Sequence, residues 1–351
     1  MKNRLLIYGC NGYTGKLIAE IAVKNGLNPV LSGRNEQAVK SIADALQCEY
    51  RTFDLVGDFS SQLSDIKTVL HCAGPFMYTA SAMAKTCIAT QTHYLDITGE
   101  ISVFETLKRL DEKAKAAKIT VMPGVGFDVV PTDCLSLYLK EQLPDATSLE
   151  LCLMNKGGML SHGTTITVIE NLGEGSAIRS NGKIINTKSG SHTREIDFGS
   201  TKKLAVEIPW GDVSTAYFTT GIPNIRVYNV LPLSLIKNMK RSNYLGFILK
   251  QRWVKDYLIK KVKQRPAGPD EQMRKEAQSF IWGEVKNDKG ETKKATLTLP
   301  EGYLLTALTA VKIAGETLLE SYAAIGYKTP ASVFGADFVL QFEGVKREFL
   351  N

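Results

Sequence analysis

Long apolar runs are missing from this sequence, and so are the usual signals of export. No run reaches the 18 apolar residues that a membrane-spanning helix requires, so no such helix is expected. The chain starts Met-Lys-Asn-Arg and passes directly into a short apolar segment, without the apolar core of a signal peptide. We therefore expect a cytoplasmic protein.

Residues that bind metals or form disulfides are few and scattered. The six cysteines show no C-x-x-C spacing, and the four histidines form no local ligand pattern. We therefore expect no metal site. Because several cysteines lie within apolar patterns, we expect buried, reduced thiols.

The charge balance is basic but uneven. Residues 1–130 carry 14 basic and 13 acidic side chains, whereas the remaining residues carry 29 and 23. The excess therefore lies outside the first third of the chain and suggests anionic ligands or surfaces. No motif for base recognition is present, so a nucleic-acid partner is not expected.

The first 125 residues alternate between two kinds of pattern. Short apolar runs predict strands over Arg4–Tyr8, Pro29–Ser32, Tyr50–Phe53, Thr68–Cys72, Tyr94–Ile97 and Thr120–Met122. Helical spacing is found over Tyr13–Lys24, Asn35–Leu46, Ala80–Ala89 and Val103–Lys118. Repeated βα units predict an α/β fold whose N-terminal part is a Rossmann domain with a doubly wound parallel sheet.

After Pro123 the pattern changes, and a chain of 351 residues exceeds the usual size of one domain. A helix is expected over Thr132–Leu143, and longer alternating runs predict a second α/β domain with a mixed sheet. We expect an NADP-binding domain over 1–125, with 325–351 packing on it. Residues 126–324 would then form a substrate and dimerisation domain.

A glycine loop follows the first predicted strand and opens the first predicted helix. In Gly9-Cys10-Asn11-Gly12-Tyr13-Thr14-Gly15, the first glycine allows a sharp turn and the second lets the backbone approach a pyrophosphate. The third glycine allows the helix to pack closely on the strand. The helix N-terminus then offers amide groups to the phosphates. This arrangement predicts dinucleotide binding by residues 9–15.

The ends of the next strands indicate which dinucleotide is bound. Where NAD-binding domains carry an acid, this chain has Ser32-Gly33-Arg34, and a guanidinium can bind a 2′-phosphate. NADP(H) is therefore the predicted cofactor. Asp54 follows the third strand and could accept a hydrogen bond from the adenine amine. The turn at Cys72-Ala73-Gly74-Pro75-Phe76 is expected beneath the ribose and nicotinamide.

Several blocks together resemble the saccharopine dehydrogenase-like oxidoreductases, and most of all the branch that contains mycobacterial trans-acting enoyl reductases. The blocks are Gly-Cys-Asn-Gly-Tyr-Thr-Gly at 9–15, Ser-Gly-Arg at 32–34, Ala-Gly-Pro-Phe at 73–76, Tyr-Leu-Asp-Ile-Thr-Gly-Glu at 94–100, Pro-Gly-Val-Gly-Phe-Asp-Val-Val-Pro-Thr-Asp at 123–133, Ser-His-Gly-Thr-Thr at 161–165 and Trp-Gly-Glu-Val at 282–285. The resemblance implies a Rossmann domain, a second domain of mixed sheet, a cleft between them and NADP(H)-linked redox chemistry. It leaves the substrate open, and a small or lipid-like molecule is our expectation.

Three side chains are candidates for the proton chemistry that accompanies hydride transfer. Tyr94 lies near a strand's carboxyl end, Asp128 follows a glycine-containing loop, and His162 lies in a loop of the second domain. Each has a structural alternative, such as capping a turn. A catalytically silent sensor or scaffold that binds the nucleotide is therefore the alternative function.

A short-chain dehydrogenase is the competing enzyme class. Its Tyr-x-x-x-Lys pair would fall on a helix within a single Rossmann domain, but here the pattern occurs only at Tyr257 and Lys261. That late position argues against this class.

Residues 226–265 combine apolar and aromatic runs with ten basic side chains between Lys237 and Arg265, against one acid, Asp256. Such helices can lie in a membrane interface. The other interpretations are an exposed helical face or an oligomer contact, such as that of a homodimer.

Overall fold

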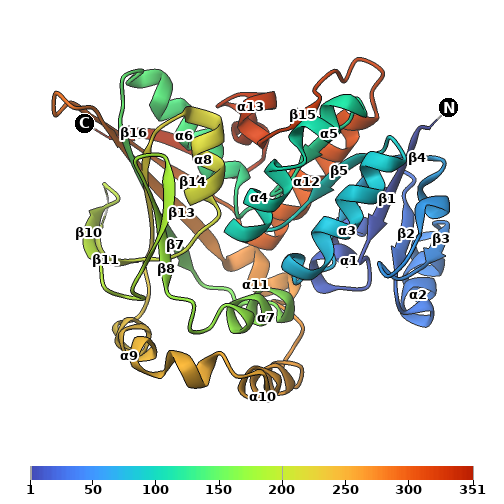
Figure 1. Ribbon diagram of the computed structural model, residues 1–351, viewed down its shortest axis with the longest axis horizontal. Coiled ribbons are helices and arrows are strands. Elements are labelled where there is room, and N and C mark those ends of the chain that lie inside the picture. The colour runs from blue at the N-terminus through green and yellow to red at the C-terminus, as the bar shows by residue number, and fades with distance from the viewer. Residues whose placement is uncertain (1, 200, 351) are drawn as a thin grey trace. The chain divides into compact units, whose positions relative to one another are not determined.

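A computed structural model describes residues 2–199 and 201–350. These residues form two compact units (Figure 1). Unit 1 comprises residues up to Val130 together with Tyr303–Val333, and unit 2 comprises Pro131–Gly302 together with the segment from Phe334 onwards. Each unit is therefore built from segments that are far apart in the sequence.

Unit 1 contains a seven-stranded sheet in which every neighbouring pair is parallel. The spatial order is β15-β6-β5-β4-β1-β2-β3. The strands are β1 (Arg4–Tyr8), β2 (Val30–Gly33), β3 (Tyr50–Thr52), β4 (Ile66–His71), β5 (His93–Asp96), β6 (Thr120–Met122) and β15 (Gly326–Tyr327). This is the strand order of the dinucleotide-binding fold, so the predicted fold class is confirmed.

The order of strands reverses at β1, which lies between β2 and β4. Right-handed crossovers in opposite directions from this point place helices on both faces of the sheet. The helices of unit 1 are α1 (Tyr13–Lys24), α2 (Glu36–Leu46), η1 (Ser60–Leu63), α3 (Phe76–Ala89), α4 (Ile101–Lys108), α5 (Asp111–Ala116), α12 (Gly302–Leu318) and α13 (Pro330–Phe334). The carboxyl ends of β1 and β4 form the switch point, where ligands bind in such sheets.

Local signals determine the ends of the first two helices. Helix α1 has the predicted bounds and ends at Asn25, followed by Gly26 with a φ of +78°. The side chain of Asn35 caps α2 by accepting a hydrogen bond of 3.0 Å from the Ala38 amide, as expected for an N-cap asparagine.

The helix predicted over residues 103–118 is wrong as a single element, because two helices, α4 and α5, occupy this segment. The carboxylate of Asp111, the first residue of α5, accepts a 2.8 Å hydrogen bond from the Tyr327 amide at the start of β15. Residue 327 is far away in the sequence, so this contact is invisible to local helical spacing.

Unit 2 contains a mixed, mainly antiparallel sheet of nine strands. Seven strands follow the order β10-β11-β12-β7-β13-β14-β16, and β8 joins β12 and β9 beside this path. Only β12 and β7 pair in parallel among the neighbours of the described sheet. The strands are β7 (Ser148–Lys156), β8 (Ser176–Ser180), β9 (Lys183–Thr187), β10 (Thr193–Asp197), β11 (Lys202–Glu207), β12 (Asn224–Asn229), β13 (Gln278–Lys286), β14 (Thr292–Leu299) and β16 (Lys346–Leu350).

Unit 2 also contains the helices α6 (Val130–Gln142), α7 (His162–Glu170), α8 (Asp212–Thr220), α9 (Leu233–Leu249), α10 (Arg252–Val262), α11 (Glu271–Glu276) and η2 (Phe338–Gln341). Of these, α6 and α8 pack on this sheet. Helix α6 approaches β13 so closely that a Cβ added at Gly283 would lie 2.7 Å from the Leu139 side chain. The glycine of the Trp-Gly-Glu-Val block therefore allows helix–sheet packing.

The units differ in extent from the predicted domains. Helix α12, which the sequence assigns to the second domain, lies in unit 1. Of the segment 325–351, β15 pairs with β6 in unit 1, whereas β16 lies in the sheet of unit 2. Which unit each of these segments joins depends on contacts between residues that are far apart in the sequence. The functional division into an NADP-binding domain and a substrate domain stays a prediction.

None of the described helices is long and apolar enough to span a membrane. The six cysteines are free thiols, and Cys10, Cys87, Cys134 and Cys152 are buried. Burial raises the pKa of Cys10 to about 11, so its thiol stays protonated at neutral pH.

Candidate functional site

The glycine loop leaves β1 in a sharp turn. Gly9 has a φ of +89°, a conformation that favours glycine. Its amide donates a 2.7 Å hydrogen bond to the Ser32 carbonyl, which links the loop to the end of β2. A Cβ on Gly9 would lie 2.8 Å from the amide nitrogen of Ala73, so the loop also packs against the end of β4. The first glycine therefore joins the three strands at the switch point.

The start of α1 suits an anion. Gly12 occupies the N-cap and supplies no side-chain hydrogen bond to the first turn. Gly15, the third residue of the helix, lies so close to the loop that an added Cβ would be 2.1 Å from the Gly9 carbonyl oxygen. Tyr13 contacts Tyr303 of α12 edge-to-face, and Thr14 follows it in the first turn. That this loop holds a pyrophosphate on the N-terminus of α1 stays a prediction.

The end of β2 carries the groups predicted to select the cofactor. The Ser32 hydroxyl is buried and has no hydrogen-bond partner among the described residues. Arg34 is exposed, and its guanidinium forms no hydrogen bond or ion pair with any residue that the structure describes. Asn11 lies beside this strand end, since a Cβ at Gly33 would be 2.8 Å from its Oδ1. A free cation next to an unused hydroxyl fits a 2′-phosphate.

Asp54 lies two residues after β3 and is exposed. Its Oδ1 accepts a 2.6 Å hydrogen bond from the Leu55 amide. Burial raises the pKa of Tyr8 to about 12, and the Asp54 charge adds to the rise while Arg34 opposes it. Asp54 and Arg34 therefore both lie near the Tyr8 ring, at the same edge of the sheet.

The turn after β4 continues the loop of the switch point. The Cys72 amide donates a 2.7 Å hydrogen bond to the Tyr8 carbonyl, and Gly74-Pro75 precedes the first residue of α3, Phe76. The Phe76 amide donates a 2.8 Å hydrogen bond to the Glu100 carboxylate. Glu100 of the Tyr-x-Asp-x-Thr-Gly-Glu block thus caps α3, a structural role that sequence reasoning missed.

Tyr94 is fully buried, and its hydroxyl donates a 2.7 Å hydrogen bond to Oδ2 of Asp96. Oδ1 of Asp96 accepts hydrogen bonds from the amides of Thr98 at 2.9 Å and Gly124 at 3.0 Å. Burial raises the pKa of Asp96 to about 6, although these three donors oppose the rise. The pair ties the end of β5 to the loop after β6. A catalytic role for Tyr94 stays a prediction.

Asp128 lies at the same sheet edge, in the loop between β6 and α6. Its carboxylate is packed against Gly99, where an added Cβ would lie 2.6 Å from Oδ2. Burial raises its pKa to about 6, close enough to neutrality for proton exchange. The loop is fixed by α12, because the Phe127 amide donates a 3.0 Å hydrogen bond to the Thr306 hydroxyl.

His162, the third catalytic candidate, lies in unit 2 and is the first residue of α7. Its Nε2 lies 2.9 Å from the Arg265 carbonyl oxygen. The ring lines a cavity of about 230 Å³ together with Met159, Leu160 and Val262. Tyr94 and Asp128 are thus within one unit, whereas His162 belongs to the other.

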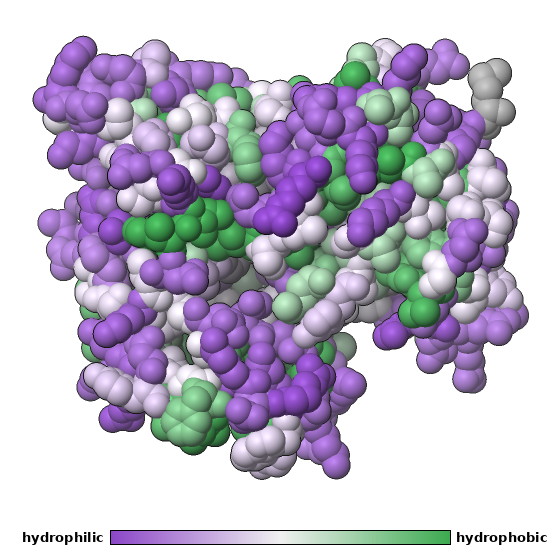
Figure 2. Space-filling model, in the orientation of Figure 1, coloured by the Kyte–Doolittle hydropathy of each residue, from purple (hydrophilic) through white to green (hydrophobic). Residues whose placement is uncertain are grey.

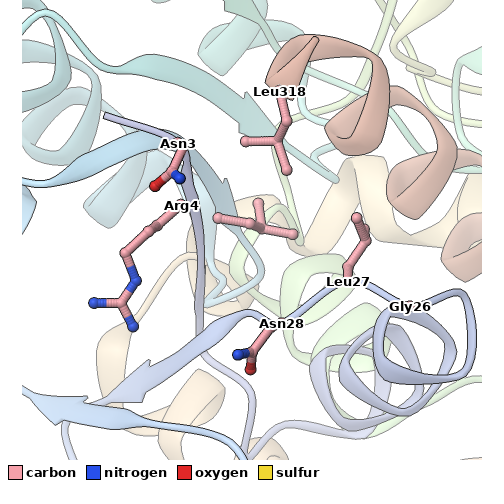
Figure 3. A pocket seen from close by; sticks show the side chains of 7 residues that line it. Asn3, Arg4, Gly26, Leu27, Asn28 and Leu318 are labelled. Carbon is pink, nitrogen blue, oxygen red and sulfur yellow. The ribbon is translucent and has the colours of Figure 1, made fainter. Parts of the chain in front are cut away.

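A second cavity, of about 410 Å³, lies at the opposite edge of the unit 1 sheet from the glycine loop. Figure 3 shows Leu27 and Leu318 beside it, while the Arg4 side chain extends away from these leucines. Arg4 is paired with Glu49 and Asp65, so its charge is already used. This cavity is at the amino end of β1 and does not belong to the dinucleotide site.

His71 is a buried group that the sequence did not reveal. It is the last residue of β4, and its Nε2 lies 2.9 Å from the Thr79 hydroxyl, which donates to the Ala73 carbonyl. Burial lowers its pKa to about 3, so the ring is neutral. It follows the apolar pair Val69 and Leu70, and this position gave no signal that distinguishes it from core residues.

Comparisons with known proteins agree with this geometry. Residues 5–122 match the family model of the saccharopine dehydrogenase NADP binding domain. The N-terminal region is therefore a domain of this type, and the predicted cofactor class, NADP(H), is confirmed at the level of the domain.

The curated relatives that match this chain are named as oxidoreductases or reductases. A saccharopine dehydrogenase-like oxidoreductase from Rattus norvegicus is 24% identical over 212 residues, which cover 53% of this chain and 49% of that protein. A trans-acting enoyl reductase from Mycobacterium leprae is 27% identical over 158 residues, which cover 42% of this chain and 38% of that protein. The predicted resemblance is confirmed. The chain matches about half the length of the first relatives, or less.

One solved structure shares the fold of the whole chain. The apo form of saccharopine dehydrogenase (L-Glu forming) from Saccharomyces cerevisiae superposes with a TM-score of 0.70. The alignment covers 99% of this chain and 100% of that chain at 12% identity. At this identity the likeness concerns the fold.

Proposed function

We propose that this protein is an NADP(H)-dependent oxidoreductase that reduces a small or lipid-like substrate. The observation that carries the proposal is the end of β2, where Arg34 is exposed without a partner among the described residues beside the unused Ser32 hydroxyl. The glycine loop lies next to both, because the Gly9 amide binds the Ser32 carbonyl. A cation here favours a 2′-phosphate over a bare ribose.

The residues at the switch point fit the cofactor. The loop from Gly9 to Gly15 would hold the pyrophosphate, Arg34 and Ser32 the 2′-phosphate, and Asp54 the adenine amine. The run from Cys72 to Phe76 would pass beneath the ribose and nicotinamide. When bound, the cofactor supplies or accepts the hydride.

Within unit 1, Asp128 is the best candidate for the proton that accompanies the hydride. Its pKa of about 6 allows both protonation states near neutral pH. Tyr94 is better explained as a positioning residue, since its hydroxyl is bonded to Asp96. The Asp96 carboxylate in turn holds the Gly124 amide, at the start of the loop that carries Asp128.

The name of one relative and the apolar side chains of unit 2 guide the choice of substrates. The name of the mycobacterial relative refers to an enoyl group, so conjugated enoyl thioesters are the first compounds to test. Imines and ketones are the other acceptors of a hydride. The aromatic and aliphatic side chains of α9 and α10 support an apolar substrate.

Oxidation of NADPH by the purified protein tests the proposal, with enoyl, imine and keto substrates supplied in turn. We expect the NADPH absorbance to fall with at least one class, and more slowly with NADH. Tight NADPH binding without turnover of any class would contradict the enzyme and favour a sensor or scaffold. Failure to bind either nucleotide would overturn both the enzyme and the sensor or scaffold.

A further inference from the structure

Helices α9 and α10 of unit 2 expose large apolar side chains, which we call the α9–α10 face. Tyr244 is 84% exposed, Phe247 70% and Trp253 69%. In Figure 2 a green patch bordered by purple lies at the lower edge of the view, where Figure 1 labels α9. The members of the face are Leu233, Leu235, Tyr244, Leu245, Phe247, Ile248, Trp253 and Tyr257. Soluble proteins rarely leave so many large apolar groups together in water.

Several of these exposed residues lie on the same side of their helix. Tyr244, Phe247 and Ile248 are three and four residues apart, so they share one side of α9. Trp253 and Tyr257 are four residues apart and share one side of α10. Ile236 in the first turn of α9 is buried, and so is Val262 of α10, which lies on the side opposite Trp253; these residues help to hold the helices in place.

Further contacts anchor α10 to the body of unit 2. The Arg252 guanidinium lies 3.0 Å from the buried Glu170 carboxylate and 2.8 Å from Asp256. The only acid of the segment is therefore paired. The outward side chains are thus presented by a fixed helix.

Most of the other cations around this face have no such partners. Seven exposed basic side chains form no ion pair with any residue in 2–199 or 201–350, and they are Lys237, Lys240, Arg241, Lys260, Lys261, Lys263 and Arg265. The Lys261 ammonium lies 4.7 Å from the centre of the Tyr257 ring. Positive charge and aromatic surface therefore occupy the same side of α10.

We propose that the α9–α10 face binds the surface of a lipid bilayer that contains anionic lipids. Trp and Tyr rings are suited to the boundary between headgroups and acyl chains, because they combine an apolar body with a polar group. Lysines and arginines beside them attract anionic headgroups. Apolar side chains flanked by cations are the pattern of helices that lie in a membrane interface.

The composition of the face favours a bilayer over a protein partner. Protein interfaces are depleted in lysine, particularly at their centre, whereas five of the seven unpaired cations here are lysines. A second copy of this chain would bring the same positive charges against one another. A bilayer with negative headgroups complements them.

Co-sedimentation of the full chain with vesicles tests the proposal. Vesicles of phosphatidylcholine alone are compared with vesicles that also contain phosphatidylserine. We expect binding that requires phosphatidylserine and weakens with added salt. Lys260→Gln together with Lys261→Gln should reduce partitioning about thirtyfold, since each lysine near such a surface contributes about 1 kcal/mol.

The controls separate charge, apolar contact and folding. Lys202→Gln with Lys203→Gln removes two adjacent exposed lysines from β11 and should leave partitioning unchanged. Trp253→Ala should weaken binding even at low salt, with the circular dichroism spectrum retained. Equal binding to both vesicle types, or no binding, would overturn the proposal. So would a dimer in sedimentation velocity that Trp253→Ala dissociates, because a protein would then cover the face.

Discussion

Replacing Gly15 by alanine tests the packing of the glycine loop against α1. The added Cβ would lie 2.1 Å from the Gly9 carbonyl oxygen and 2.9 Å from its carbonyl carbon. Contacts of this kind are normally longer than 3 Å, and both atoms belong to backbone that is fixed by hydrogen bonds to Ser32. Helix or loop must therefore move by about 1 Å, which costs about 1–3 kcal/mol when a packed region is overfilled.

The gain in helix propensity from glycine to alanine, about 1 kcal/mol, offsets part of this cost. We expect Gly15→Ala to lower the melting temperature by a few degrees, because about 1 kcal/mol corresponds to roughly 2–4 °C for a domain of this size. The movement also displaces the amides of the first turn, so NADPH affinity should fall about tenfold or more.

Gly315→Ala is the matched control. Gly315 lies within α12, and a Cβ added there would meet no other part of the described chain within 4 Å beyond its own helix backbone. The substitution should therefore raise the melting temperature or leave it unchanged. Differential scanning calorimetry and fluorescence titration with NADPH measure both quantities. A Gly15→Ala protein as stable as the wild type, with the same affinity, would refute the packing argument.

Three further predictions concern single side chains. Burial lowers the pKa of His71 from its ordinary 6.5 to about 3, so the unfolded chain binds a proton at this ring before the folded chain does as the pH falls. The free energy of unfolding should therefore decrease from about pH 6.5 downwards. His71→Phe should make this decrease smaller, as measured by urea unfolding followed by circular dichroism. Asn35→Ala should destabilise α2 by about 1 kcal/mol in the same assay, and an unchanged midpoint would contradict the cap. If Asp128 donates the proton, kcat/KM should fall as pH rises through about 6, and Asp128→Asn should remove this dependence.

The elements of unit 1 that depend on local signals could be predicted from the sequence. Gly12 and Asn25 delimit α1, and the cap by Asn35 begins α2, because glycine conformations and side-chain caps act within a few residues. The roles of the glycine loop follow from the same kind of pattern. They required no knowledge of the rest of the chain.

Contacts between distant residues could not be predicted. Thr306 and Thr309 of α12 bind the Phe127 amide and the Val125 carbonyl, and thereby hold the loop that carries Asp128. The alternation of side chains along a strand predicts that Tyr94 and Asp96 lie on the same side. It does not predict the hydrogen bond between them. The periodicity of a sequence predicts which face of an element a side chain occupies, but it does not predict which residue that side chain contacts.

The affinities of NADPH and NADH for Arg34→Gln test whether Arg34 selects NADP(H). Isothermal titration should show NADPH binding weakened about tenfold to a hundredfold, since a charged hydrogen bond contributes about 1.5–3 kcal/mol. NADH binding should change by less than about twofold, because NADH has no 2′-phosphate. Lys24→Gln, an exposed cation at the far end of α1, should alter neither affinity. An equal loss for both nucleotides, or no loss for NADPH, would contradict the claim.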